Sequence, residues 1–124
     1  MQKFSRIKIS KEATGKLRAL KARTGVTPNL LCRMALCYSL NNERISNLIP
    51  EDEEGQEFNR FTLTGEYDSY FVALVKERCI QDGLDPEKEF ISQFKRHLNH
   101  GIMIVSSRIK DLPDMITLFG VTSE

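Results

Sequence analysis

The residues with the clearest chemical potential are lysines and arginines gathered in the first quarter of the chain. Residues 1–33 contain nine of the 18 Lys and Arg residues but only one of the 17 acidic residues. The net charge of +1 therefore conceals a segment of net charge +8 followed by one of net charge −7. A dense run of one charge sign is the electrostatic signature of a polyanion-binding surface, and here it predicts contact with nucleic acid.

Most of these cations fall where strand alternation and helical spacing turn them outward. On a helix with about 100° per residue, Lys11, Arg18 and Lys21 share one flank, and Lys16 and Arg23 share the other. Single lysine or arginine side chains near a helix start can donate hydrogen bonds to the edge of a guanine or to phosphate oxygens. We expect mainly phosphate contacts. The predicted DNA-binding residues are Lys3, Arg6, Lys8, Lys11, Lys16, Arg18, Lys21 and Arg23.

Residues typical of catalytic and metal sites form no recognisable motif in the sequence. His97 and His100 are spaced i, i+3, but no nearby Cys or carboxylate completes a ligand set, so we expect both to face solvent. Cys32 and Cys37 match no zinc spacing, and the sequence contains no Gly-rich phosphate loop and no Ser/His/Asp grouping. The sequence therefore predicts a protein without catalytic residues, metal or cofactor, and not an enzyme.

A strand and two helices position the basic residues. Polar and apolar residues alternate over Phe4–Ser10, which predicts a strand, and Ser10 can cap a helix over Lys11–Thr24 that ends at Gly25. A Thr-Pro pair then starts a second helix over Pro28–Leu40. The outward positions of the strand are Arg6, Lys8 and Ser10.

The same pattern recurs 54 residues later, with a strand predicted over Phe58–Thr64, a helix over Gly65–Gln81 and a helix over Pro86–Asn99. A strand followed by two helices is the pattern of ribbon-helix-helix proteins, in which two antiparallel strands enter the major groove of DNA. The outward positions of the second strand are Arg60, Thr62 and Thr64. The two strands pair either within one chain or each with a second copy, and the sequence leaves this open.

The predicted fold class is mainly α, with two strand–helix–helix units of the ribbon-helix-helix type in one compact domain over residues 1–124. An acidic, polar stretch joins the units, and an apolar run after Gly101 leads to a last short helix. The predicted parts are a basic, DNA-facing unit over 4–40, an acidic linker over 41–57, a second unit over 58–100 and a C-terminal tail with a short helix over 101–124.

The helix predicted over Pro28–Leu40 is apolar nearly all round, so more than one of its faces must be covered. A chain of this size achieves this by placing the helix centrally, by forming a subunit interface, or by both, and we favour both. The predicted oligomer-interface residues are Leu30, Leu31, Met34, Leu36 and Tyr38.

Two further features bear on the cellular compartment. No apolar stretch approaches the ~20 residues needed to span a bilayer, and the N-terminus lacks the apolar core of a signal peptide. The three cysteines lie in apolar helical contexts, which indicates buried, reduced thiols. These observations predict a cytoplasmic protein.

Three segments of the basic unit carry a resemblance to a known family: Arg6–Ser10 (RIKIS), Leu17–Asn29 (LRALKARTGVTPN) and Leu31–Cys37 (LCRMALC). In these segments and in overall length the chain resembles the DndE family of the bacterial DNA phosphorothioation system, which replaces a non-bridging phosphate oxygen with sulfur. The resemblance implies a mainly helical subunit that binds double-stranded DNA through exposed cations and self-associates, with a tetramer suspected. It also implies protein partners, namely a cysteine desulfurase, an iron–sulfur protein and an ATPase.

Two other functions remain open at this stage. A ribbon-helix-helix transcriptional regulator would bind a palindromic site with high sequence specificity, although such regulators usually consist of a single short unit. A metal-dependent DNA nickase would use the carboxylates of the linker, which are Glu51, Asp52, Glu53 and Glu54.

Overall fold

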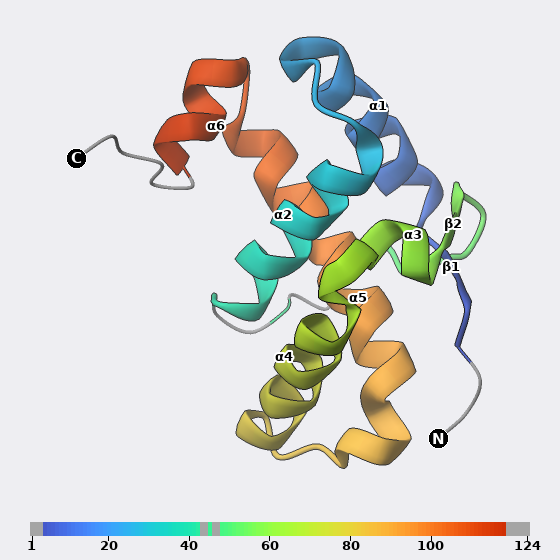
Figure 1. The fold of residues 1–124 in the computed structure, drawn as a ribbon. Helices are drawn as coiled ribbons and strands as arrows, with labels where there is room; N and C mark the ends of the chain where they lie inside the picture. Colours follow the sequence, from blue (N-terminus) through green and yellow to red (C-terminus); the bar gives the residue numbers. More distant parts are fainter. Residues whose placement is uncertain (1–3, 43–44, 46–47, 119–124) are drawn as a thin grey trace.

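The computed structural model describes residues 4–42, 45 and 48–118, which form a mainly helical fold with one small antiparallel sheet (Figure 1). The elements, in order, are β1 (Arg6–Lys8), α1 (Lys11–Thr24), α2 (Pro28–Leu40), β2 (Glu57–Asn59), α3 (Arg60–Thr64), the 3-10 turn η1 (Gly65–Tyr67), α4 (Asp68–Gln81), α5 (Pro86–Arg108) and α6 (Leu112–Leu118).

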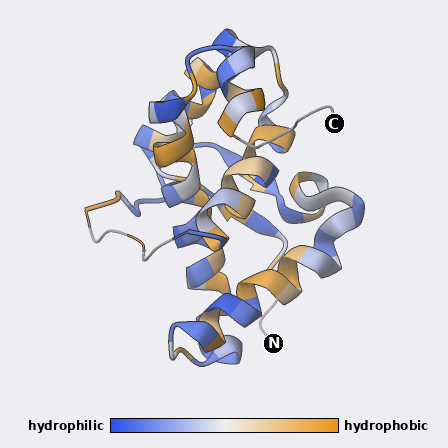
Figure 2. Cartoon of the chain, turned by 90° about the vertical axis from the view of Figure 1, so that its left-hand side faces the viewer, coloured by the Kyte–Doolittle hydropathy of each residue, from blue (hydrophilic) through white to orange (hydrophobic). Residues whose placement is uncertain are grey.

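The long helix α5 is the centre of the molecule and packs against α1, α2 and α4. Figure 1 shows α5 running between α4 at one end of the molecule and α1 with α6 at the other. Phe90 and Phe94 of α5 are buried and meet Phe4 edge to face, with ring centroids 6.0 and 5.3 Å from that of Phe4. Hydrophilic and hydrophobic stretches alternate along the helical ribbons (Figure 2), as expected when each helix buries one face.

Local signals set the boundaries of α1 and α2, and the predictions for both helices are confirmed. The Ser10 hydroxyl oxygen accepts a hydrogen bond from the Ala13 N–H at 3.0 Å, which satisfies an otherwise orphan donor of the first turn. Gly25 ends α1 in the left-handed conformation at φ 75°, which costs glycine little. Pro28 then occupies the first turn of α2.

The first strand is shorter than predicted, because only Arg6–Lys8 pair with another strand. Ile7 is buried while Arg6 and Lys8 are exposed, as the alternation predicts, but Ser10 is fully buried instead of facing outward. Its backbone N–H donates to the Asn99 side chain at 2.9 Å, so the start of α1 is tied to α5.

The second strand is the clearest departure from the predicted pattern. It covers only Glu57–Asn59, because the Asn59 side chain accepts from the Thr62 N–H at 3.0 Å and starts the helix α3 at once. Arg60 and Thr64 are therefore buried on a helix instead of facing outward on a strand, which corrects the prediction, whereas Thr62 is exposed. β2 pairs with β1 of the same chain, so the strands are joined intramolecularly.

The helix after Pro86 does not end near Asn99 as predicted, but continues through Gly101 to Arg108. A Cβ atom at Gly101 would overlap the backbone carbonyl of Ala35 in α2. Gly101 therefore serves the close crossing of α2 and α5 and does not end a helix. The apolar run after it is the last part of α5, and the predicted short C-terminal helix is α6.

Candidate nucleic-acid interface

The exposed side of α1 carries two rows of basic side chains. Ala13, Leu17 and Leu20 are buried against the core, which fixes the orientation of the helix. At helical spacing the opposite side then faces solvent, with one row of cations on each flank. All five cations of the helix are exposed: Lys11, Arg18 and Lys21 on one flank, and Lys16 and Arg23 on the other.

Most of these side chains have no hydrogen-bond or ion-pair partner among the described residues. Within the part of the chain that the structure describes, Lys16, Arg18 and Lys21 form no hydrogen bond or ion pair through their side chains. Arg23 donates from Nη2 to the Ser106 carbonyl at 3.2 Å. The α1 surface thus presents several exposed cations that form no ion pair with the described residues.

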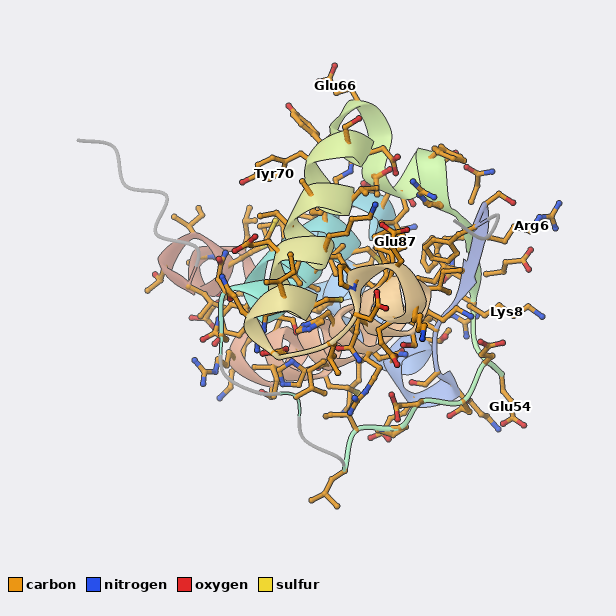
Figure 3. The ribbon with its side chains drawn as sticks, turned by 90° about the horizontal axis from the view of Figure 1, so that it is seen from below. Arg6, Lys8, Glu54, Glu66, Tyr70 and Glu87 are labelled. Atoms are coloured by element: carbon orange, nitrogen blue, oxygen red, sulfur yellow. The ribbon has the colours of Figure 1, made fainter. Side chains whose placement is uncertain are left out.

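The ribbon formed by β1 and β2 is electrostatically mixed. Arg6 and Lys8 point away from the molecule along one edge (Figure 3). In the register of the sheet, however, Arg6 lies opposite Asn59 and Lys8 lies opposite Glu57, and Arg6 Nη1 is 3.2 Å from Glu57 Oε2. Arg6 of β1 is therefore paired with an acid, whereas no cation of α1 forms an ion pair among the described residues. The predicted contact Lys3 lies outside the described residues.

The carboxylates of the acidic stretch are engaged with cations and backbone donors. Asp52 Oδ1 accepts from the Lys11 N–H at 2.9 Å and from the Glu54 N–H at 3.1 Å, and the first of these hydrogen bonds contributes most to holding the pKa of Asp52 below its usual value. A carboxylate in this place also stabilises the positive end of the α1 dipole. Glu51 and Glu53 pair with basic residues of α5. Among the described residues, no group of three or more His, Cys, Asp or Glu side chains could hold a metal ion.

The predicted oligomer interface on α2 divides into surface and core residues. Leu31 and Leu36 are fully buried, so they have no surface to offer another subunit, which corrects two of the five predicted residues. Leu30 is 44% exposed, and Met34 and Tyr38 are half-buried.

An apolar groove of about 410 Å³ runs along the exposed part of α2. Leu30 and Met34 line it from α2, and Tyr67 and Tyr70 line it from η1 and α4. Figure 3 shows Tyr70 projecting from α4 at the surface of the molecule. No signal in the sequence points to the two tyrosines, because only the tertiary fold brings α4 beside α2.

The two histidines are buried, which corrects the expectation that they face solvent. Their Nδ1 atoms lie 2.7 Å (His97) and 2.8 Å (His100) from the Ser39 hydroxyl oxygen, so both rings on α5 are held by one residue of α2. Burial is the main cause that lowers the pKa of His97 to about 4 and also lowers that of His100, and the nearby Arg78 adds to both effects. Both rings are therefore neutral at neutral pH.

Arg78 of α4 closes the C-terminal end of α2. Its Nη1 atom donates to the carbonyl groups of Leu40 at 2.9 Å and Asn42 at 2.7 Å, and its Nε atom donates to Asp82 at 3.0 Å. These contacts satisfy carbonyl groups that a helix end leaves without intrahelical partners. Arg78 therefore serves the fold and not an external ligand.

The predicted burial of the thiols is confirmed for Cys32 and Cys79, whereas Cys37 is half-buried. No disulfide joins these three residues. Burial raises the pKa of Cys32 to about 12, so this thiol is protonated and unreactive.

Comparison with known families identifies the chain. The family described as "DNA sulphur modification protein DndE" matches residues 6–111, a range that begins in β1 and ends just before α6. The chain belongs to the DndE family. The range that matches the DndE family includes both strands and the helices α1 to α5, and so it includes the basic surface of α1.

Two solved DndE structures have the same fold as this chain. One is DndE from Escherichia coli B7A, described as involved in DNA phosphorothioation modification, with 24% sequence identity, a TM-score of 0.68, and coverage of 85% of this chain and 99% of that one. The other is a DndE mutant involved in DNA phosphorothioation, with 22% identity, a TM-score of 0.65, and coverage of 84% and 99%. Among curated proteins, no sequence matches this DndE-family chain. Within the described residues, no helix has the length and apolar character required to cross a membrane.

Proposed function

We propose that this DndE-family chain is a non-catalytic subunit of the DNA phosphorothioation system that holds the phosphate backbone of double-stranded DNA through α1 and the adjoining β1. The observation that carries the proposal is the pair of exposed cation rows on α1, in which Lys16, Arg18 and Lys21 have no intramolecular partner within the described residues. Unpaired cations in two rows can neutralise several phosphates at once.

The ridge between the two rows supports close approach of a DNA strand. Gly15 and Ala22 are exposed there, and a Cβ atom added at Gly15 would meet nothing within 4 Å. Small side chains on this ridge let a sugar-phosphate backbone come near the helix while longer cations reach around it from each side. Such contacts fix position on DNA without selecting a sequence.

In ribbon-helix-helix proteins the two-stranded ribbon recognises DNA bases. The geometry of this chain supports that role for β1 and β2 less well than it supports phosphate binding by α1. Glu57 pairs with Arg6 on the outer face of the ribbon, and the side-chain oxygen of Asn59 is used to cap α3. Because these groups are occupied, we assign backbone binding to α1 and a supporting role to Arg6 and Lys8.

Self-association is part of the proposal. The apolar groove lined by Leu30, Met34, Tyr67 and Tyr70 supports a protein contact, since apolar side chains are exposed there in one place. The resemblance to DndE proteins adds a suspected tetramer, and it adds as partners the cysteine desulfurase, the iron–sulfur protein and the ATPase of sulfur transfer.

Salt-dependent fluorescence anisotropy on labelled duplexes of unrelated sequence tests the DNA-binding role. We expect binding that is equal across sequences and a plot of log K against log salt with a slope steeper than about −3. The double variant Lys16→Gln/Lys21→Gln should make the slope shallower by roughly two, because each phosphate contact contributes about −0.9. The matched control Lys76→Gln/Lys110→Gln removes two cations outside α1 and should leave the slope unchanged.

Absence of binding at ~50 mM salt, or equal effects of the two double variants, would contradict the DNA-binding role. The non-catalytic part of the proposal has its own test, in which supercoiled plasmid is incubated with the protein and Mg²⁺ or Mn²⁺. We expect the plasmid to stay supercoiled. Nicking that disappears in a quadruple variant of the acidic residues 51–54 would identify a nickase instead.

A further inference from the structure

The acidic residues 51–54, here called the strap, lie across a basic pocket. The pocket has a volume of about 450 Å³ and is lined by Lys8 of β1 and by Lys88, Lys95 and Arg96 of α5, together with Glu51 and Glu53 of the strap. Figure 3 shows Lys8 and Glu54 at the same edge of the molecule, where the strap passes beside β1. Four cations thus face two carboxylates in a single depression.

Two ion pairs form in the lining of the pocket. Glu53 Oε1 lies 2.5 Å from Lys95 Nζ, and Glu51 Oε1 lies 2.6 Å from Arg96 Nε. The carboxylates are about half exposed (56% and 50%), whereas the two cations are only 27% and 28% exposed. The cations are therefore built into the surface, and the acids reach them from the solvent side.

The arginine of the pocket is not fully satisfied by its acidic partner. Arg96 Nε is buried and, among the described residues, forms no hydrogen bond of good geometry although Glu51 is close. Lys8 and Lys88 make no ion pair in the described part of the chain. The pocket therefore has donor capacity that two carboxylates leave unused, and an anion with more oxygens can use it.

Hydrogen bonds of Asp52 and of the two residues after the strap hold it against the start of α1. Asp52 is bonded to the first turn of α1, the Gly55 N–H donates to the Ile9 carbonyl at 2.9 Å, and the Gln56 N–H donates to Thr14 Oγ1 at 2.8 Å. A Cβ atom at Gly55 would overlap Thr14 Oγ1 and the Ser10 carbonyl, so only glycine allows this approach. The strap is thus anchored at the start of α1, beside the surface proposed to bind DNA.

We propose that this pocket is a second phosphate-binding site, and that Glu51 and Glu53 occupy it as internal competitors of the DNA backbone. The inference rests on the proposed DNA-binding function. Carboxylates and phosphates share negative charge and acceptor oxygens, and partly exposed ion pairs are weak enough for a polyanion to displace them. DNA that displaces the two acids gains Lys8, Lys88, Lys95 and Arg96 as an extension of the α1 surface.

Neutralising the competitors tests the proposal on the intact chain. Glu51→Gln/Glu53→Gln should raise the affinity for a 20-bp duplex about tenfold at 50 mM salt and steepen the salt slope by one to two, since two more phosphate contacts form. The control Glu66→Gln/Glu77→Gln changes the net charge equally on exposed positions of η1 and α4, and it should change the affinity less than twofold. Equal gains in both variants would overturn the proposal, because the effect would then be general electrostatics.

Removing two pocket cations from the Glu51→Gln/Glu53→Gln variant tests whether its gain in DNA affinity arises at the pocket. Adding Lys95→Gln and Arg96→Gln to Glu51→Gln/Glu53→Gln should return the affinity and slope to those of the wild type. Thermal melting followed by circular dichroism confirms that each variant is folded. A gain that persists without Lys95 and Arg96 would show that phosphate is bound elsewhere and would overturn the proposal.

A measurement without DNA separates this inference from the proposed function. Inorganic pyrophosphate titrated into Glu51→Gln/Glu53→Gln should shift the backbone amide resonances of Ser92, Lys95 and Arg96, and the added Lys95→Gln/Arg96→Gln changes should abolish these shifts. Such shifts support the pocket even if the wild type binds no duplex. Their absence overturns it even if the α1 surface binds DNA as proposed.

Discussion

Residues 4–40 and 58–100, the first and second units of the sequence analysis, use their cations differently. In the first unit the cations of α1 extend into solvent, whereas in the second unit Arg60 and Arg78 are turned inward. Arg60 donates to Asp68 from Nε at 3.0 Å and from Nη2 at 2.8 Å, and it donates to the Phe4 carbonyl at 2.9 Å. Arg78 is bonded to Asp82 and to the end of α2.

The difference comes from the acids available to each unit. In the second unit an acid lies within reach of each buried arginine, so the guanidinium groups can be desolvated and used to join helices. Burial alone would raise the pKa of Asp68, but hydrogen bonds from Arg60 and Thr64 outweigh it and lower that pKa. The first unit has a single acid, Glu12, and the cations of its helix α1 stay in solvent. The buried arginines of the second unit thus serve the fold, whereas the exposed cations of α1 are left for a ligand.

The largest effect should come from matched Arg→Met replacements in the two units. Arg60→Met leaves Asp68 and the Phe4 carbonyl without their donor, so we expect the free energy of unfolding to fall by about 4 kcal/mol. Arg6→Met removes only the exposed pair with Glu57, and it should cost less than about 1 kcal/mol. Urea denaturation of both variants measures these values. Similar losses in both would mean that the two units do not differ in how they use their arginines.

Two helix glycines, one in α1 and one in α5, provide the next test. Gly101→Ala forces a Cβ atom into the Ala35 backbone, so we expect α2 and α5 to separate and stability to fall by about 3 kcal/mol. Gly15→Ala adds its Cβ where nothing lies within 4 Å and should stabilise α1 by about 0.5–1 kcal/mol. Thermal melting of the two variants should therefore shift in opposite directions, and a shift of the same sign would be inconsistent with this packing.

Acid should destabilise the contact between the units. His97 binds its proton with a pKa of about 4 in the folded protein and near 6.5 when unfolded, so the unfolded state binds more protons between these values. The contribution of His97 to stability is fully present above about pH 6.5 and is lost as the pH falls toward 4, by up to about 3 kcal/mol. Urea midpoints between pH 7 and 4.5 measure this loss. His97→Asn should flatten the profile, and an unchanged slope would assign the pH dependence to other groups.

The smallest effect concerns the ribbon that β1 and β2 form together. Glu57→Gln releases Arg6 from its exposed ion pair and removes the acid opposite Lys8. We expect roughly a twofold gain in duplex affinity at low salt, since a weak surface pair is all that is lost. Anisotropy titrations beside Glu66→Gln as control measure it, and a gain as large as that expected for Glu51→Gln/Glu53→Gln would move the main DNA contact from α1 to the ribbon.

How far the sequence could predict the structure depends on whether a signal is local. The limits of α1 and α2 were predicted correctly, because the residues that set them affect only the adjacent helical turn. These residues are Ser10, Gly25 and Pro28. The exposed cations of α1 likewise follow from helical spacing around a buried stripe.

Residues whose place depends on distant partners escaped prediction. Arg60 has the alternation of a strand residue, but Asn59 starts a helix and Asp68 lies ready to pair with it. In the sequence, Gly101 has the character of a helix breaker and the two histidines have that of surface residues. Gly101 is instead needed where α5 crosses Ala35 of α2, and both histidines are buried against Ser39 of α2. The engagement of the strap acids by Lys95 and Arg96 is tertiary in the same way.

The position of Ser39 has a consequence for where protons reside. A hydroxyl group has one proton, so it can donate to one imidazole and must accept from the other. His97 Nε2 is buried and, among the described residues, has no partner, which favours the bare nitrogen there over an orphan N–H. His97 therefore carries its proton on Nδ1 and donates to Ser39, and Ser39 donates to His100, whose proton is on Nε2. The two histidines are thus opposite tautomers, and the hydrogen-bond chain runs one way from α5 to α2 and back to α5.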